Sequence, residues 1–394
     1  MKLPIDFQIT GLRAGLYKNP KKLDLALFYS KKPCNAAGVF TTNQVKAAPI
    51  LISQKHIQNK IHAIIANSGC ANACTGKQGL QDAEQICEWT AESLQIQKQQ
   101  ILIASTGVIG KFLPLQKIKI GIQKIARSIQ NSQSTLSPLT AVEAIMTTDT
   151  VPKWTSTEII IKNKKITLWG CAKGSGMIHP NMATLFSFIL TDAEIAATKL
   201  RALLKETVDQ TFNRLSVDGD TSTNDCTFIL ANGASSSITT TPELQLFKTA
   251  LKKICGDLAQ KIAADGEGAT KQITIDIQNS RTEKEAKKIA ETIATSPLVK
   301  TAFFGEDANW GRILAAMGRS GVSIDPNKIS ILFDHLYVFK NGTPINFSEK
   351  TAKKILQKKS ITLTINLNQG KTHIQYFTCD FSIDYVKINA DYRS

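Results

Sequence analysis

The chain has 394 residues, a formal net charge of +16 at pH 7, 42% hydrophobic residues and 20% charged residues. This length predicts two or three globular domains with enough apolar material for sizeable cores. No window holds the ~20 apolar residues that span a bilayer, and the N-terminus lacks the apolar stretch of a secretory signal, so we expect a cytoplasmic protein.

The basic residues do not follow the pattern of a nucleic-acid interface. Of the 48 basic residues, 40 are lysine and only 8 are arginine, and the lysines are scattered along the chain. Proteins that contact bases and phosphates favour arginine forks and interleaved aromatic side chains. We therefore interpret the charge as a solvated lysine surface that attracts small anionic substrates, with an RNA-binding protein as the alternative from another class.

Metal binding is not expected from the sequence. The eight cysteines are too few for a disulfide framework in a chain of this length. Cys70 and Cys74 lie four residues apart, but no second Cys/His pair has the spacing that would complete a zinc site. Asp218, Asp220 and Asp225 lack the spacing of a calcium-binding EF hand, so we interpret this segment as a structural loop.

The first third of the chain is predicted to mix strands and helices. Residues 62–66 and 101–104 are short apolar runs typical of buried strands, and residues 81–94 carry apolar side chains at helical spacing between them. The second strand leads into a turn of small residues at 105–110.

The middle of the chain begins with a predicted β-hairpin. Residues 158–161 and 166–169 have the composition of strands, and the hydrophilic residues 162–165 between them indicate a loop. A segment of small residues follows at 171–184, where two glycines and one proline exclude a regular helix or strand.

Helices and strands are predicted to alternate up to about residue 297, and the chain beyond is predicted to be mainly β. Thr282 and Glu285 form the capping-box pattern of one helix, which we expect to end before Pro297. The other predicted elements are helices at 200–215 and 244–262, and strands at 227–230, 273–277, 329–333, 361–367 and 373–381. These elements indicate an α/β or α+β protein with a smaller C-terminal module.

Thr184 is a candidate nucleophile that would need activation. A threonine hydroxyl is weakly nucleophilic, but a threonine at a chain N-terminus can use its own α-amine, with a pKa of about 7.7–8.0, as the base. Thr184 would gain that amine only if the peptide bond after Ala183 broke. The kinked segment ahead of it permits such chemistry, although most threonines in this position only begin a strand or helix.

The segment 173–184 closely resembles the autocleavage motif of the glutamate/ornithine N-acetyltransferase family of arginine biosynthesis. Eight further segments resemble motifs of that family and occur in the family's order across nearly the whole chain. They are residues 36–43, 67–76, 105–110, 146–150, 218–225, 266–271, 307–312 and 388–394.

The resemblance implies that the chain cleaves itself between Ala183 and Thr184 into an α chain and a β chain that stay associated, usually as α2β2. It also implies a layered αββα sandwich of the self-cleaving amidase type. The expected parts are the α chain, 1–183, and the start of the β chain, 184–280, which together form the catalytic core, and a smaller C-terminal α/β domain, 281–394.

The implied reaction moves an acetyl group from N2-acetyl-L-ornithine to L-glutamate through an acetyl-Thr184 intermediate. The resemblance implies no cofactor, and it leaves open whether acetyl-CoA also serves as a donor, because both types of family member share these motifs. The alternative is a self-processing amidase or aminopeptidase of the same fold, in which water accepts the acyl group.

The resemblance also implies roles for individual residues. The Thr106 hydroxyl and the Gly107 N–H match donors that stabilise the tetrahedral oxyanion, although a turn of this kind is ordinary by itself. Lys173 is the expected contact for a substrate carboxylate and Glu267 for an amine. Thr147 matches a substrate contact, with the adjacent Thr148 left open.

Two C-terminal residues complete the expected substrate contacts. Asn389 and Ser394 match terminal positions of the family, which more often ends in threonine; serine keeps the hydroxyl. His179 lies five residues before Thr184 and is expected to shape the loop rather than to act as a base. Arg312 is expected to form structural contacts rather than to bind the substrate.

Overall fold

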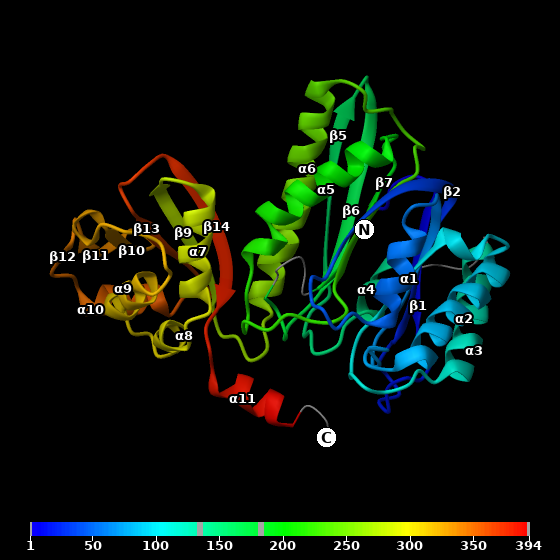
Figure 1. The fold of residues 1–394 in the computed structure, drawn as a ribbon, viewed down its shortest axis with the longest axis horizontal. Coiled ribbons are helices and arrows are strands. Elements are labelled where there is room, and N and C mark those ends of the chain that lie inside the picture. The colour runs from blue at the N-terminus through cyan, green and yellow to red at the C-terminus, as the bar shows by residue number, and fades with distance from the viewer. Residues whose placement is uncertain (1, 132–136, 180–184, 392–394) are drawn as a thin grey trace. The chain divides into compact units, whose positions relative to one another are not determined.

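The computed structural model describes residues 2–131, 137–179 and 185–391, so Ala183, Thr184 and Ser394 lie outside the described residues. The chain divides into two compact units, whose elements are labelled in Figure 1. The first unit comprises Met1–Gly174, Pro180–Asn213 and Thr221–Leu258, and the second comprises Ser175–His179, Arg214–Asp220 and Ala259–Ser394.

The first unit contains an eight-stranded sheet in the order β4-β3-β2-β8-β7-β6-β5, with β1 also paired to β2. The strands are β1 (Phe7–Leu12), β2 (Leu25–Phe40), β3 (Ile61–Asn67), β4 (Ile101–Ser105), β5 (Lys153–Ile161), β6 (Lys164–Lys173), β7 (Phe186–Thr191) and β8 (Cys226–Ala231). The long strand β2 takes part in both halves, because residues 25–29 pair with β1 and β3 while residues 35–40 pair with β8.

The two halves of this sheet face each other across an apolar core. Phe28 of β2 lies 6.4 Å from Trp169 of β6 and 5.0 Å from Phe188 of β7, measured between ring centroids. Helices α2 (Gly76–Leu94) and α3 (Leu115–Gln130) cover the outer side of one half, in a separate buried cluster with β2, β3 and β4. Burial of apolar side chains on both faces of each half stabilises this arrangement.

The other half is covered by α6 (Thr241–Ala264), which packs so closely that a Cβ on Gly170 of β6 would lie 2.8 Å from Ile254 of the helix. Figure 1 shows α5 (Ala197–Gln210) beside the same half. The order helix, sheet, sheet, helix confirms the predicted αββα fold class. The remaining helices of this unit are α1 (Ala48–His56) and α4 (Pro138–Ala144).

The predicted hairpin between β5 and β6 is confirmed, with a shorter loop than expected. Lys162 and Asn163 alone form the turn, with φ of +51° and +58°, and Ile161 pairs directly with Lys164. Two successive residues with left-handed backbone conformations match the right-handed twist of the flanking strands, so a two-residue loop is sufficient.

The second unit contains a six-stranded sheet in the order β12-β11-β10-β13-β9-β14. The strands are β9 (Gln272–Ser280), β10 (Ser330–Phe333), β11 (Leu336–Lys340), β12 (Thr343–Pro344), β13 (Ser360–Asn366) and β14 (Thr372–Cys379). Helix α7 (Glu283–Ala294) packs on this sheet, and the predicted cap is present: the Thr282 side chain accepts a hydrogen bond from the Glu285 N–H at 3.2 Å.

The expectation of a mainly β chain beyond residue 297 is wrong. Four short helices interrupt the strands: α8 (Pro297–Phe304), α9 (Trp310–Gly318), α10 (Glu349–Leu356) and α11 (Ile383–Ala390). Asn309, Ser348 and Ser382 cap the last three through their side chains. Helices of about two turns give too few repeats for a helical period to stand out, so their caps were the only strong local signal.

The last of the boundaries between the two compact units along the sequence falls between Leu258 and Ala259, within α6. Strand β9 pairs with both β13 and β14, and so belongs to the second unit. The predicted division has its first boundary, 183/184, at the expected cleavage site and its second, 280/281, at an expected domain boundary. This division into residues 1–183, 184–280 and 281–394 stays a prediction.

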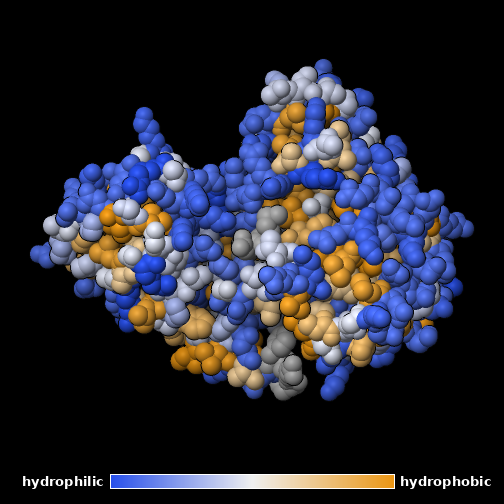
Figure 2. Space-filling view, viewed as in Figure 1, coloured by the Kyte–Doolittle hydropathy of each residue, from blue (hydrophilic) through white to orange (hydrophobic). Residues whose placement is uncertain are grey.

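On the face shown in Figure 2, hydrophilic residues predominate and apolar residues form scattered patches. None of the helices in the described residues is both long enough and apolar enough to cross a membrane.

Candidate active site

Polar residues gather where several strands of the first unit begin or end. Lys173 is the last residue of β6 and pairs with Phe186, the first residue of β7, which in turn pairs with Cys226, the first residue of β8. Just before β8, the Asn224 amide donates to the Ser105 carbonyl at the end of β4, at 2.6 Å. This bond links the end of β4 in one half of the sheet to the start of β8 in the other, so residues from both halves are brought to one end of the sandwich.

The turn after β4 holds two hydrogen-bond donors. The Thr106 N–H donates to the Asn67 carbonyl at 3.0 Å, which fixes the start of the turn. Gly107 has a φ of +126°, and a Cβ there would lie 2.6 Å from the Cys70 nitrogen, so only glycine fits. Within the described residues, neither the Thr106 hydroxyl nor the Gly107 N–H has a hydrogen-bond partner, which suits a pair that stabilises an oxyanion.

The structure brings together two of the predicted substrate contacts, Thr147 and Lys173. The Lys173 ammonium donates to the Thr147 hydroxyl at 3.2 Å and lies 5.5 Å from the ring centroid of Phe186. The side chain of the adjacent Thr148 makes no hydrogen bond with any described residue, so Thr147 is the one that the fold places beside Lys173.

Asp149, which was not among the predicted site residues, anchors this pair. Its carboxylate forms an ion pair with Lys153 at 2.6 Å, and the two side chains are 0% and 1% exposed. It also accepts the N–H groups of Gly174 at 2.7 Å and of Thr147 at 3.0 Å. Burial disfavours the charged form, but Lys153 and Lys173 outweigh it and hold the pKa of Asp149 below its usual value. The spacing of Asp149 and Lys153, four residues apart, was the only sign in the sequence that the two could form an ion pair.

Asp225 is a second buried carboxyl at this end of the sandwich. Its Oδ2 atom has no hydrogen-bond partner among the described residues. Burial raises the pKa of Asp225 well above its usual value, although the charge of Lys173 opposes the shift. The next residue, Cys226, donates its N–H to the Leu185 carbonyl at 3.1 Å, and Leu185 directly follows Thr184 in the chain. Asp225 is therefore a buried carboxyl whose surroundings favour its neutral form.

In the second unit the structure brings together Glu267 and Asn389. The Asn389 amide of α11 donates to the Glu267 carboxylate at 2.8 Å, and Glu267 is buried. A Cβ on Gly176 would lie 2.2 Å from the same carboxylate, so this glycine makes room for it. The pairing of Glu267 with Asn389 had no signal in the sequence, because the two residues are 122 positions apart.

The segment before residue 180 is tied down within the second unit. Asp218 accepts the N–H groups of Met177 at 2.6 Å and of Ile178 at 2.9 Å, which is a structural role. His179 forms an ion pair with Glu291 of α7 at 3.0 Å, and its other ring nitrogen lies 3.2 Å from the Ser216 hydroxyl. These contacts agree with a role of His179 in loop structure.

Arg312 also makes a structural contact, because its guanidinium donates to the Leu298 carbonyl at 3.0 Å. No group of three or more His, Cys, Asp or Glu residues in the described part of the chain could hold a metal ion.

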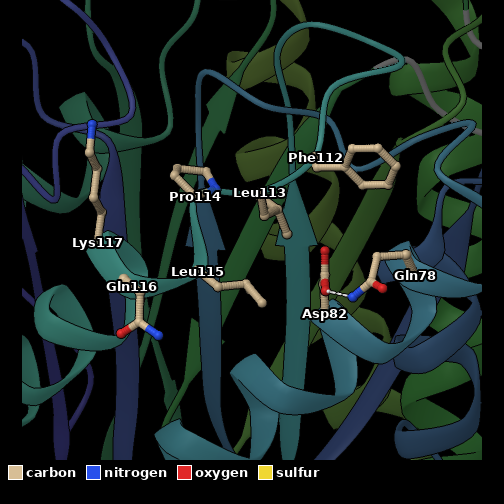
Figure 3. Close-up of a pocket in the computed structure, with 8 residues that line it drawn as sticks. All are labelled: Gln78, Asp82, Phe112, Leu113, Pro114, Leu115, Gln116 and Lys117. Atoms are coloured by element: carbon tan, nitrogen blue, oxygen red, sulfur yellow. Dashed lines mark hydrogen bonds between the residues drawn. The ribbon is translucent and has the colours of Figure 1, made fainter.

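A pocket of about 440 Å³ lies elsewhere in the first unit, next to α2 and α3. Figure 3 shows Gln78 and Asp82 joined by a hydrogen bond of 2.7 Å, with the Phe112 ring near them. None of the predicted site residues lines this pocket.

The predicted residues within the described chain thus form two groups. We call Thr106, Gly107, Thr147 and Lys173 the first-unit group, and Glu267 and Asn389 the second-unit group. Ala183, Thr184 and Ser394 were also predicted and lie outside the described residues.

Comparison with known proteins gives a consistent result over the whole chain. A model of the ArgJ family matches residues 8–394. The arginine biosynthesis bifunctional protein of Clostridium acetobutylicum is 47% identical over 98% of this chain and 96% of that protein. Its counterpart from Thermotoga neapolitana is 44% identical over 100% of both chains. A crystal structure of the arginine biosynthesis bifunctional protein from Bacillus halodurans is 40% identical, with a TM-score of 0.50 over 52% of this chain and 97% of that chain.

Proposed function

Because this chain belongs to the ArgJ family, we propose that it transfers the acetyl group of N2-acetyl-L-ornithine to L-glutamate in arginine biosynthesis. The observation that carries the proposal is the turn at Thr106 and Gly107, whose two donors are unpartnered within the described residues and lie at the same end of the sandwich as Lys173. Acyl transfer passes through a tetrahedral oxyanion, and such donors stabilise it.

The nucleophile in this proposal is Thr184, freed by cleavage of the bond that joins it to Ala183. Leu185, the next residue, is fixed through its carbonyl to the start of β8. The solved Bacillus halodurans chain spans about half of this sequence, as a product of cleavage would. This agreement in length supports processing into an α chain, 1–183, and a β chain, 184–394.

In the first half-reaction, the Thr184 hydroxyl oxygen would attack the acetyl carbonyl while the α-amine of Thr184 takes the hydroxyl proton. The Thr106 hydroxyl and the Gly107 N–H would donate to the developing oxyanion. The C–N bond then breaks, ornithine leaves with that proton on its α-amine, and acetyl-Thr184 remains. The α-amine of glutamate would attack this ester in the second half-reaction, restoring the threonine and giving N-acetylglutamate.

The two groups of residues are proposed to make different kinds of contact with the substrates. Lys173 and Thr147 are proposed to bind the α-carboxylate that ornithine and glutamate share, because an ammonium and a hydroxyl both donate to carboxylates. Glu267, with Asn389 and Ser394, is proposed to bind the amine end. Glu267 is a buried carboxylate with an amide partner, which suits a cationic ligand.

The same proposal covers co-substrates and assembly. The relatives are named bifunctional, which supports a second activity. We propose that this second activity is the acetylation of glutamate with acetyl-CoA as the donor. No other cofactor is required by the chemistry. We also propose a cytoplasmic α2β2 assembly.

Intact mass spectrometry combined with an acetyl-transfer assay tests the proposal. The wild type should give two chains that separate at 183/184 and should transfer acetyl groups to glutamate. Thr184→Ala should give one uncut, inactive chain. An uncut wild type with full activity would refute the nucleophile, and release of acetate without acetylglutamate would favour the amidase alternative.

A further inference from the structure

Lys22 lies in a loop that is held rigidly in the first unit. The loop, residues 13–24, joins β1 to β2, and its ends are paired where Leu12 meets Leu25. The buried Asp24 carboxylate accepts the N–H groups of Gly15 at 3.0 Å and Leu16 at 2.6 Å. A short loop closed on itself in this way fixes the position of a residue beside its anchor.

The Lys22 ammonium meets Thr147, the same residue that Lys173 contacts. It donates to the Thr147 carbonyl and lies 4.2 Å from the ring centroid of Tyr17. Lys173 donates to the Thr147 hydroxyl at 3.2 Å. Two ammonium groups from segments far apart in the sequence therefore converge on one threonine.

No carboxylate lies within ion-pairing distance of Lys22 in the part of the chain that the structure describes. Asp149 is the acid whose charge acts on it, but its oxygens already serve Lys153, Gly174 and Thr147. Burial lowers the pKa of Lys22, and the nearby charge of Lys173 lowers it further against the effect of Asp149. A half-buried ammonium without an anion is unfavourable, and an incoming carboxylate would relieve that cost.

We propose that Lys22 is a second ammonium contact for the substrate α-carboxylate, which it clamps together with Lys173 and Thr147. The inference rests on the proposed function, since ornithine and glutamate share that carboxylate. Two ammonium groups that meet one hydroxyl-bearing residue match the two oxygens of a single carboxylate. Lys22 is thus a binding residue that makes the enzyme require an amino acid rather than a simple amine.

The test compares Lys22→Met with wild type on two donors, N2-acetylornithine and its α-carboxamide, N2-acetylornithinamide. A charge-assisted hydrogen bond lost from the substrate should lower kcat/KM for N2-acetylornithine about 10- to 100-fold, mainly through KM. The carboxamide should already be a poor donor for the wild type, and Lys22→Met should change its kcat/KM by less than about threefold. The neighbouring exposed lysine provides the matched control: Lys21→Met should behave as wild type.

An equal loss on both donors would show that Lys22 only supports Thr147, and no loss on either would show that it does not bind the substrate; both outcomes overturn the inference. If Lys22→Met does not fold by circular dichroism, Lys22→Arg decides, because it keeps the charge and should keep the preference for the carboxylate donor. A wild type that transfers no acetyl from N2-acetylornithine would instead refute the proposed function, and the inference with it.

Discussion

The two groups of site residues differ in the charge that they offer. The first-unit group consists of hydroxyl, N–H and ammonium donors, supported by the buried Asp149. The second-unit group centres on the Glu267 carboxylate, with Asn389 as its amide partner. Amino-acid substrates carry both charges, so under the proposed function the donors and the carboxylate would each be supported by the core of a different unit.

The first prediction concerns Asp149, whose buried carboxylate stabilises the first-unit group. Asp149→Asn should lower the free energy of unfolding by about 3–5 kcal/mol, because it removes the carboxylate charge that is paired with the buried Lys153 ammonium. Chemical denaturation measures this loss. Asp384→Asn is the matched control, since its ion pair with Lys387 is exposed and should contribute little. Equal stability of the two variants would show that Asp149 is not an anchor.

The same carboxylate should give the wild type a specific pH dependence. The pKa of Asp149 is lower in the folded protein than in the unfolded chain, so its contribution to stability is present above the unfolded pKa, about 3.9. That contribution is lost as the pH falls through the folded pKa. The melting temperature of the wild type should therefore fall below about pH 4. In Asp149→Asn, the part of this fall that is due to Asp149 should be absent.

The donor role of the first-unit group is tested at Thr106. Thr106→Ala should lower kcat about 10²- to 10³-fold with little change in KM, because the hydroxyl acts only on the oxyanion. Steady-state kinetics measure the effect, and Thr148→Ala should leave kcat unchanged. A rise in KM with a normal kcat would place Thr106 in ground-state binding instead.

In the second-unit group, the charge to remove is the negative charge of Glu267. Glu267→Gln keeps the shape but removes the charge, and should raise KM for N2-acetylornithine about 10- to 100-fold. The exposed Glu349→Gln in the same unit is the control. An unchanged KM would mean that the cationic end of the substrate is bound elsewhere, and the contrast between the two groups would fail.

The smallest effect is expected at the contact between Glu291 and His179. Their ion pair is partly exposed, at 39% and 17% for the two side chains, so Glu291→Gln should cost less than about 1 kcal/mol of stability. The hydrogen bond from His179 lowers the pKa of Glu291, so this contribution is present above about pH 4.3 and is lost at lower pH. Urea denaturation at pH 7 and at pH 3 would detect it.

Local signals in the sequence predicted individual elements in both units, but not β1, β2, α1, α3 or α4 of the first. The apolar runs at 62–66 and 101–104 are strands β3 and β4, and Thr282 caps α7 as its capping box indicated. Each of these features is decided by a few consecutive residues. The helices α8 to α11 were missed because two helical turns show little periodicity.

The candidate site was predictable only in part. Thr106, Gly107 and Lys173 were found through motifs, whereas Asp149 received no role although its partner lies four residues away. The contact of Lys22 with Thr147 joins residues 125 positions apart. The pairing of β1 with β2 places the loop that carries Lys22, and the Gly11 N–H of β1 donates to the Thr140 hydroxyl of α4, the helix that precedes Thr147. Such contacts depend on topology, which no local pattern records.

The strand order of the first unit bears on what happens after the chain is cut. Strands β2 and β6 precede residue 183, whereas β7 and β8 follow it, and β8 pairs with β2 while β7 pairs with β6. The two products would thus be interleaved within one sheet, with the later pair of strands inserted between strands of the earlier piece. Separating them would require breaking two ladders of backbone hydrogen bonds and opening the apolar core, so cleavage would free a new amine without freeing either chain.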